Sequence, residues 1–230
     1  MPVSNSFERG ERDGVKRGLA NLLKADIYGI TAEEYSLGRS NIQVAALMIE
    51  SGIKVIQYRE KEKTMRRKYA DCLAIRRMTA DAGVTFIVND HVDLAMMVGA
   101  DGVHLGQDDL PPDKVRELTG GRIIIGLSTH SPAQAEAAVN AGVDYIGVGP
   151  LYATKTKKDV CAPVGLSYLD YVVKNIKLPF VAIGGIKEHN AAEVSNRGAK
   201  CIALVTEIVG AENIYEKVSA LRAVFKQKEV

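Results

Sequence analysis

The sequence predicts a protein of the α/β class, a single (β/α)8 barrel preceded by a helical extension. Three observations predict this fold: short apolar runs that alternate with helix-like stretches, glycines that follow those stretches, and a length of 230 residues. A barrel of this kind typically needs about 250 residues, so one barrel would use nearly the whole chain. We expect residues 1–25 to form the extension and residues 26–230 to form the catalytic barrel.

Eight short runs have the residue composition of β-strands. Several are apolar throughout, among them Phe86-Ile87-Val88 and Val181-Ala182-Ile183, which is typical of parallel strands buried on both faces. Eight strands that alternate with helices favour a barrel over a doubly wound open sheet, which usually has fewer strands. The expected strands are Asp26–Thr31, Lys54–Glu60, Thr85–Asp90, Gly102–Gly106, Ile123–Thr129, Tyr145–Tyr152, Pro179–Gly185 and Cys201–Thr206.

The stretches between these runs carry the signals of helices. Ser131, Pro132 and Gln134 are the residue types that open a helix at its N-cap, N1 and N3 positions. Glycine, which tolerates the left-handed conformation after a helix, recurs before the expected strands at Gly52, Gly83, Gly99, Gly120, Gly142 and Gly198. Two apolar stripes have helical spacing, namely Ile42, Ala45, Ala46 and Ile49, and Ile214, Val218, Leu221 and Phe225.

The first 25 residues differ from the repeating unit. Phe7, Val15, Leu19, Leu22 and Leu23 can form one apolar stripe, which predicts an additional amphipathic helix. A frayed polar terminus is the alternative for the first ten residues, and the sequence leaves this choice open.

Composition excludes several classes of protein. With 47 % hydrophobic and 25 % charged residues the chain is globular, and no apolar run approaches the length of about 20 residues that spans a membrane. A net charge of +2 argues against a nucleic-acid partner. Cys72, Cys161 and Cys201 are odd in number and far apart, which argues against a disulfide framework or a zinc site. We expect a cytoplasmic protein that binds small molecules, and the sequence leaves open whether it forms a homo-oligomer.

Hydrogen-bonding and charged residues follow most of the expected strands. Any one of these groups could cap a helix or lie in a solvated loop, but active sites of barrels lie where the carboxyl ends of the strands meet. Their recurrence at that end therefore predicts one site. The groups are Gln57–Lys61, Asn89-Asp90, Gln107–Asp109, Ser128–His130, Thr154–Asp159, Gly184-Gly185 and Val205-Thr206.

The charges of this set predict two anion sites. Cationic residues at one rim of a nearly neutral chain, namely Arg59, Lys61, Lys155 and Lys157, indicate an anionic ligand. Asp90 and Asp109 are hard oxygen ligands, which suit Mg²⁺ placed between the protein and a phosphate. The residues after the last two strands, Gly184-Gly185 and Val205-Thr206, occupy the usual phosphate site of this fold. We therefore expect a metal-plus-lysine site for a diphosphate and a backbone site for a monophosphate.

Several motifs together resemble the thiamine-phosphate synthase (thiamine-phosphate pyrophosphorylase) family. The resemblance covers residues 26–215 in order and spacing, and no single motif would carry it. One departure is Thr206, where the family commonly has serine; the hydroxyl is retained. The N-terminal extension is a second departure. The motifs are Gln57-Tyr58-Arg59-Glu60-Lys61, Val88-Asn89-Asp90, Val103 to Leu110, Gly126-Leu127-Ser128, Gly149-Pro150 with Thr154 to Lys158, and Ala182 to Ile186.

The resemblance implies a reaction in which hydroxymethylpyrimidine diphosphate and a thiazole phosphate give thiamine phosphate and pyrophosphate. It implies that Mg²⁺ is bound by Asp90 and Asp109, and that the thiazole phosphate is held by Thr154, Lys155, Thr156, Gly185, Val205 and Thr206. It implies that the pyrimidine diphosphate contacts Gln57, Tyr58, Arg59, Glu60, Lys61, Asn89, Ser128 and Lys157. Of these, Arg59, Lys61 and Lys157 would act in catalysis as cations that stabilise the charge developing on departing pyrophosphate, and the resemblance implies a catalytic role for Ser128 as well.

Three other functions remain as alternatives. A metal-free thiazole tautomerase on the same barrel would need an acid or base, which His130 could supply, but it would have no use for Asp90 and Asp109. A phosphate-binding barrel of another pathway, such as a sugar-phosphate epimerase, explains Gly184-Gly185 but not the two aspartates. A non-catalytic protein that binds thiamine phosphate would show no turnover.

Overall fold

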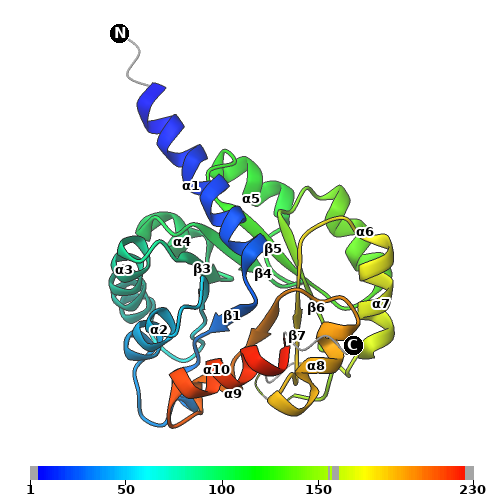
Figure 1. The fold of residues 1–230 in the computed structure, drawn as a ribbon. Helices are drawn as coiled ribbons and strands as arrows, with labels where there is room; N and C mark the ends of the chain where they lie inside the picture. Colours follow the sequence, from blue (N-terminus) through cyan, green and yellow to red (C-terminus); the bar gives the residue numbers. More distant parts are fainter. Residues whose placement is uncertain (1–4, 155, 157–160, 226–230) are drawn as a thin grey trace.

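The computed structural model describes residues 5–154, 156 and 161–225, with side chains from residue 14 onward. Eight parallel strands pair in sequence order and close into a barrel, because β1 pairs with both β2 and β8 (Figure 1). Each expected strand is present, and each is shorter than the run that predicted it. The strands are β1 Ile27–Ile30, β2 Val55–Tyr58, β3 Thr85–Asn89, β4 Gly102–Leu105, β5 Ile124–Thr129, β6 Tyr145–Val148, β7 Phe180–Ile183 and β8 Ile202–Leu204.

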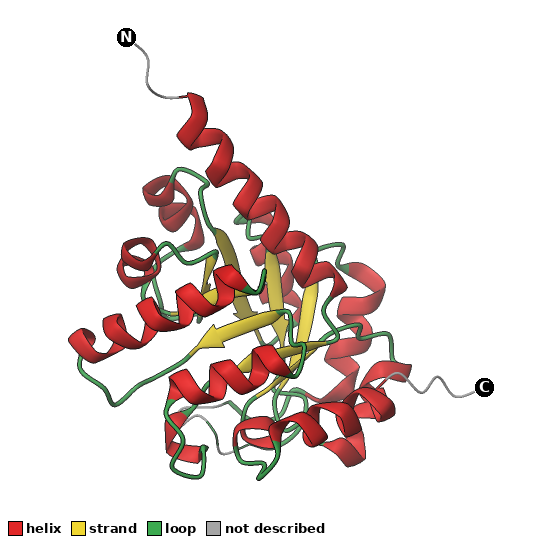
Figure 2. Ribbon diagram, turned by 60° about the vertical axis from the view of Figure 1, so that its left-hand side comes forward, coloured by secondary structure: helices red, strands yellow, loops and turns green. Residues whose placement is uncertain are grey.

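Helices surround the barrel on its outside (Figures 1 and 2). They connect successive strands in the right order for a (β/α)8 barrel, which confirms the expected fold. A short 3-10 helix, η1 (Glu33–Tyr35), follows β1. The helices after the first are α2 Asn41–Glu50, α3 Met65–Asp81, α4 Val92–Val98, α5 Pro112–Thr119, α6 Pro132–Asn140, α7 Gly165–Asn175, α8 Glu188–Asn196, α9 Thr206–Val209 and α10 Ile214–Phe225.

The expected helix signals are present, with one shift of register. The hydroxyl of Ser131 accepts from the backbone N–H of Gln134 and caps α6, and the six predicted glycines all have positive φ. In α10 the predicted stripe is buried. In α2 the buried face is displaced by one residue from the prediction and consists of Asn41, Val44, Ala45 and Met48.

The N-terminal helix α1 (Asn5–Lys24) closes the end of the barrel at which the strands begin. Leu22 is 5 % exposed and packs with Val15 and Leu19 onto the inner core, whereas Leu23 is 63 % exposed, so Leu23 does not belong to the predicted stripe. The side chain of Phe7 lies outside the described part of the chain. Asn21 fixes the helix, because its Nδ2 donates to the backbone oxygen of Gly83 at 2.9 Å and to Thr85 Oγ1 at 3.1 Å.

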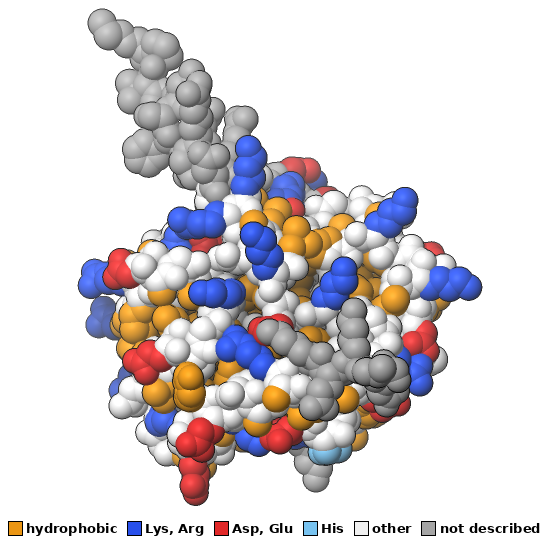
Figure 3. Space-filling view, viewed as in Figure 1, with side chains coloured by type: hydrophobic (Ala, Val, Ile, Leu, Met, Phe, Trp, Pro, Cys, Tyr) orange, Lys and Arg blue, Asp and Glu red, His pale blue; other side chains and the backbone are white. Residues whose placement is uncertain are grey.

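The apolar residues form two layers. The outer layer lies between the strands and the surrounding helices, and the inner layer fills the barrel with residues such as Val55, Ile87 and Ile124. Within the described residues no helix is long and apolar enough to cross a membrane. Figure 3 shows one face on which Lys and Arg side chains are dispersed among acidic, neutral and hydrophobic ones, without a broad basic patch.

Candidate active site

The carboxyl ends of the strands enclose a cavity of about 430 Å³. Residues of the inner core, such as Tyr145 and Val181, line the cavity on the side of the barrel interior, and the strand ends and the following loops supply the rest of its lining. Predicted site residues from six strands or their following loops line it: Gln57, Arg59, Lys61, Asn89, Asp90, Ser128, Thr154, Thr156, Gly185, Val205 and Thr206. The predicted residues Lys155 and Lys157 lie outside the described residues.

Asp90 and Asp109 approach each other at one side of this mouth. Asp90 adopts a left-handed conformation with φ of 62°, and its backbone N–H donates to the carbonyl of His104 at 2.9 Å. Oδ2 of Asp109 accepts from the backbone N–H of Gly106 at 2.6 Å. The two carboxyl groups affect each other's pKa, so the structure brings the two aspartates close together, although Asp90 lines the cavity and Asp109 does not.

Lys61 sets the charge of this pair. Its Nζ lies 2.5 Å from Oδ2 of Asp90. Burial alone would raise the pKa of Asp90, but the bond and the charge of Lys61 outweigh burial and lower that pKa. The pKa of Asp109 is raised, first by burial and then by the adjacent negative charge of Asp90. A divalent cation would relieve this repulsion, and two carboxylates with space for ligand oxygens suit Mg²⁺.

Tyr58 and Glu60 do not face the cavity, contrary to what the resemblance implied. Successive side chains of a strand point to opposite faces, so Gln57 and Arg59 point inward while Tyr58 and Glu60 point outward. Tyr58 is buried in the outer layer, where its hydroxyl donates to Oδ2 of Asp71 at 3.1 Å. Oε2 of Glu60 accepts from Nδ2 of Asn41 at 3.0 Å.

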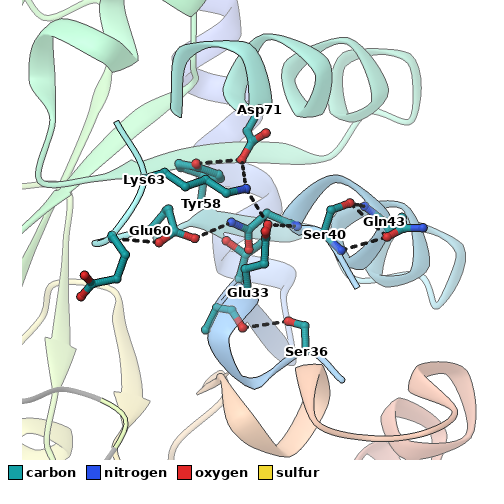
Figure 4. Close-up of polar contacts among 12 residues, drawn as sticks. Glu33, Ser36, Ser40, Gln43, Tyr58, Glu60, Lys63 and Asp71 are labelled. Carbon is teal, nitrogen blue, oxygen red and sulfur yellow. Dashed lines mark hydrogen bonds and ion pairs between the residues drawn. The ribbon is translucent and has the colours of Figure 1, made fainter. Parts of the chain in front are cut away.

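An ion-pair cluster of Lys63, Glu33 and Asp71, outside the cavity lining, anchors the loop that follows β2 (Figure 4). Nζ of Lys63 lies 2.6 Å from Oε2 of Glu33 and 2.7 Å from Oδ2 of Asp71. Burial would raise the pKa of Glu33, but the bonds from Lys63 and from the backbone N–H of Asn41, together with the charge of Lys63, outweigh burial and lower that pKa. These contacts tie the loop to η1 and α3, which fixes the direction in which its inward side chains point.

Glycine and threonine residues line the opposite side of the cavity. Gly185 has φ of 66°, and a Cβ at this residue would lie 2.6 Å from the carbonyl oxygen of Ala153, so only glycine fits there. The hydroxyls of Thr154 and Thr156 lie 3.1 Å apart on the neighbouring loop. Backbone and hydroxyl groups of this kind bind phosphate oxygens.

Lys187 adds a charge that the sequence analysis did not identify. Its Nζ lies 2.9 Å from Oε2 of Glu207 and donates to Oγ1 of Thr206 at 3.3 Å. Burial would raise the pKa of Glu207, but the bond and charge of Lys187, with smaller contributions from the Glu188 backbone and Lys217, together lower it. Lys187 lies two residues after Gly185, in the loop that follows β7. Its place beside the glycine pair could have identified it as a candidate site residue.

Three further residues inside the cavity were also missed: Tyr28, His104 and Tyr145. Each stands at an inward position of its strand, and His104 does so between two buried apolar residues, Val103 and Leu105. A polar residue inside an otherwise apolar strand is a usable signal for the interior of a barrel. His130, which the sequence analysis considered as an acid or base, also lines the cavity. Its Nδ1 lies 2.5 Å from the backbone oxygen of Gly149.

Comparison with known sequences shows which family the chain belongs to. A family model described as thiamine monophosphate synthase matches residues 27–208. The chain is 77 % identical over 214 residues to a thiamine-phosphate synthase of Pelotomaculum thermopropionicum, covering 93 % of this chain and 98 % of that protein. It is 60 % identical over 200 residues to a thiamine-phosphate synthase of Lawsonia intracellularis, covering 87 % and 92 %.

Solved structures give the same result. A thiamine phosphate pyrophosphorylase from Pyrococcus furiosus superimposes with a TM-score of 0.81 at 33 % identity, covering 89 % of this chain and 97 % of that chain. A 3-hexulose-6-phosphate synthase, at 15 % identity and a TM-score of 0.63, covers 86 % and 99 % and shares the fold alone. Because the family model spans well over half of the chain and close relatives match it nearly end to end, the chain belongs to the thiamine monophosphate synthase family.

Proposed function

We propose that this chain catalyses the thiamine-phosphate synthase reaction, joining hydroxymethylpyrimidine diphosphate to a thiazole phosphate with release of pyrophosphate. The observation that carries the proposal is the division of one cavity into two anion-binding sides. Lys61 and Asp90 line one side, where Asp109 lies beside Asp90, and Gly185 and Thr206 line the other. A diphosphate and a monophosphate can therefore be held in the same cavity at once.

The residues on the first side favour departure of the diphosphate. A bound Mg²⁺ would be held by Asp90 and Asp109 and would neutralise charge on the diphosphate oxygens. Within the described residues no group of three or more His, Cys, Asp or Glu could hold a metal ion, so diphosphate oxygens and water would complete its ligands. Arg59 and Lys61 stabilise the negative charge that grows on the leaving group, which is usually the largest catalytic contribution.

The residues on the second side orient the nucleophile. Thr154, Thr156, Gly185 and Thr206 hold the thiazole phosphate, which places the thiazole ring toward the pyrimidine and makes the attack effectively intramolecular. The attacking thiazole nitrogen carries no proton, so no general base is needed. Because the aminopyrimidine ring can support a positive charge on its methylene, we propose a dissociative substitution. The roles of Lys155 and Lys157 rest on the resemblance alone.

A pyrophosphate-release assay tests this proposal. With both substrates and Mg²⁺ the enzyme should release pyrophosphate, and omission of either substrate or chelation of the metal should stop the release. A tautomerase would act on the thiazole alone without metal, and a protein that only binds thiamine phosphate would release nothing. Either result would reject the proposed reaction.

A further inference from the structure

A chain of hydrogen bonds crosses the interior of the barrel and joins two cavity residues that are far apart in sequence. Nε2 of Gln57 donates to the hydroxyl of Tyr28 at 2.9 Å, and the hydroxyls of Tyr28 and Tyr145 lie 2.9 Å apart. The Tyr145 hydroxyl lies 2.9 Å from Nδ1 of His104, whose Nε2 lies 3.0 Å from Oγ of Ser128. Residues of β1, β2, β4, β5 and β6 thus form one connected path.

The first donor sets the direction of the whole path. Since the Gln57 amide donates to Tyr28, the single hydroxyl proton of Tyr28 is left to donate to Tyr145. Tyr145 then donates its own proton to Nδ1 of His104, so the imidazole carries its proton on Nε2 and donates it to Ser128. Among the described residues no other side chain bonds to the Ser128 hydroxyl or to Oε1 of Gln57, so this proton and this acceptor are available to a ligand.

The protein interior is shaped around this path. Tyr28 is 2 % exposed and Tyr145 is fully buried, and burial raises the pKa of both phenols, so both keep their protons at neutral pH. A Cβ on Gly126 would lie 2.5 Å from the Tyr145 hydroxyl. Glycine therefore stands where the Tyr145 ring needs space, as expected of a built arrangement.

We propose that Tyr28, Tyr145 and His104 are positioning residues that carry the hydrogen-bonding polarity set by Gln57 across the barrel to Ser128, so that Gln57 offers an acceptor and Ser128 a donor to one ligand. An aminopyrimidine carries an amino donor and ring-nitrogen acceptors, and this pair matches it. A 4-oxo pyrimidine carries an acceptor where the amino group stands. Two acceptors cannot bond to each other, so Gln57 and Ser128, with their polarity fixed, disfavour this analogue. The match to the aminopyrimidine rests on the proposed function, whereas the polarity of the path does not.

Replacement of one buried hydroxyl tests the role of the path. In Tyr145→Phe the imidazole loses the donor that holds its proton on Nε2, and we expect the KM for the pyrimidine diphosphate to rise about fivefold to tenfold. The KM for the thiazole phosphate should not change, and discrimination against the 4-oxo analogue should fall. Tyr168→Phe is the matched control, because Tyr168 is also buried and donates to Thr129 Oγ1 at 2.6 Å, outside the path.

Two further measurements separate positioning from general damage. If Tyr145 acts through Ser128, Tyr145→Phe should have no additional effect on that KM in a Ser128→Ala background. Equal effects on the two KM values, additivity in that background, or an equal effect of Tyr168→Phe would overturn the proposal. Tyr28→Phe breaks the path at another point and replaces Tyr145→Phe if that variant does not fold.

Nitrogen NMR of the wild-type protein labelled at histidine gives a reading that needs no catalysis. The His104 ring, assigned with the His104→Asn variant, should be neutral with its proton on Nε2. A proton on Nδ1 would reverse the path and refute the proposed polarity. Failure of the wild type to release pyrophosphate would reject the proposed function and leave this measurement intact.

Discussion

The ammonium group of Lys61 lies 2.5 Å from a carboxylate oxygen of Asp90, at the end of a strand where Asp90 is held at a φ of 62°. A left-handed residue other than glycine is strained by roughly 1–3 kcal/mol, and such strain is concentrated at functional sites. The ion pair and the backbone together hold the Asp90 carboxylate toward Asp109, which makes this pair the first target for mutation.

We expect Asp90→Asn to lower kcat about 100-fold or more, since it removes a charge from the diphosphate side of the cavity. Asparagine tolerates the left-handed conformation, so the midpoint of thermal unfolding should change little. The measurement is steady-state pyrophosphate release over a range of Mg²⁺ concentrations. Asp108→Asn is the control, because Asp108 is an exposed neighbour outside the cavity lining and should retain full activity.

Gly185→Ala should raise the KM for the thiazole phosphate and leave that for the pyrimidine diphosphate nearly unchanged. The added Cβ would lie 2.6 Å from the Ala153 oxygen and would displace the loop beside the monophosphate side. Gly142→Ala has nearly the same backbone strain, with φ of 69°, but no atom lies within 4 Å of its Cβ. Kinetics in which both variants behave alike would remove Gly185 from the phosphate site.

Lys63→Met should reduce the free energy of unfolding at pH 7. It should also make the fall of that free energy in acid smaller than in the wild type. The pKa of Glu33 is lowered by Lys63, so this pair stabilises the fold above the ordinary pKa of 4.5 and is lost as the pH falls below it. Urea unfolding at pH 7, 5, 4 and 3 should therefore show a shallower acid loss in the variant than in the wild type. Lys114→Met, which removes an exposed pair with Glu117, should leave the profile unchanged.

Leu22→Ala should destabilise the protein by about 3 kcal/mol, the usual cost of a cavity left by a buried leucine. Its neighbour Leu23 is 63 % exposed, and Leu23→Ala should cost less than about 0.5 kcal/mol. Chemical denaturation of the two variants makes this comparison. Equal costs would mean that α1 does not close the barrel as described.

The native protein should expose one reactive thiol. Cys161 is exposed, whereas Cys72 and Cys201 are buried, and burial raises the pKa of the Cys72 thiol to about 12. Titration with a thiol reagent should count one cysteine in the native state and three after denaturation. Rapid modification of all three without denaturant would contradict the packing around α3 and β8.

The sequence predicted the barrel well because parallel strands buried on both faces leave a local apolar signal. The strand ends were less well predicted, since runs such as Tyr145–Tyr152 include loop residues as apolar as the strand itself. In α2 the predicted face was displaced by one residue because Asn41 is fully buried, and an apolar stripe cannot reveal a polar residue held by Glu33 and Glu60.

The candidate site was predicted in its outline and missed in its interior. Lining residues such as Asn89 and Thr206 follow directly from their positions at strand ends. Tyr58 and Glu60 were misplaced because a motif gives residue order, while the alternation of the strand decides which side chains face inward. The partnership of Tyr28 with Tyr145 spans 117 positions in the sequence, and only the closed barrel brings the two hydroxyls together.

The N-terminal part of helix α1 projects from the barrel at the end opposite the cavity mouth (Figures 1 and 2). Attachment of the protein to a solid support through the first turn of this helix would therefore turn the mouth toward the flowing solution. Both reactants could enter and pyrophosphate could leave without passing the matrix, which makes this helix a natural handle for an immobilised catalyst.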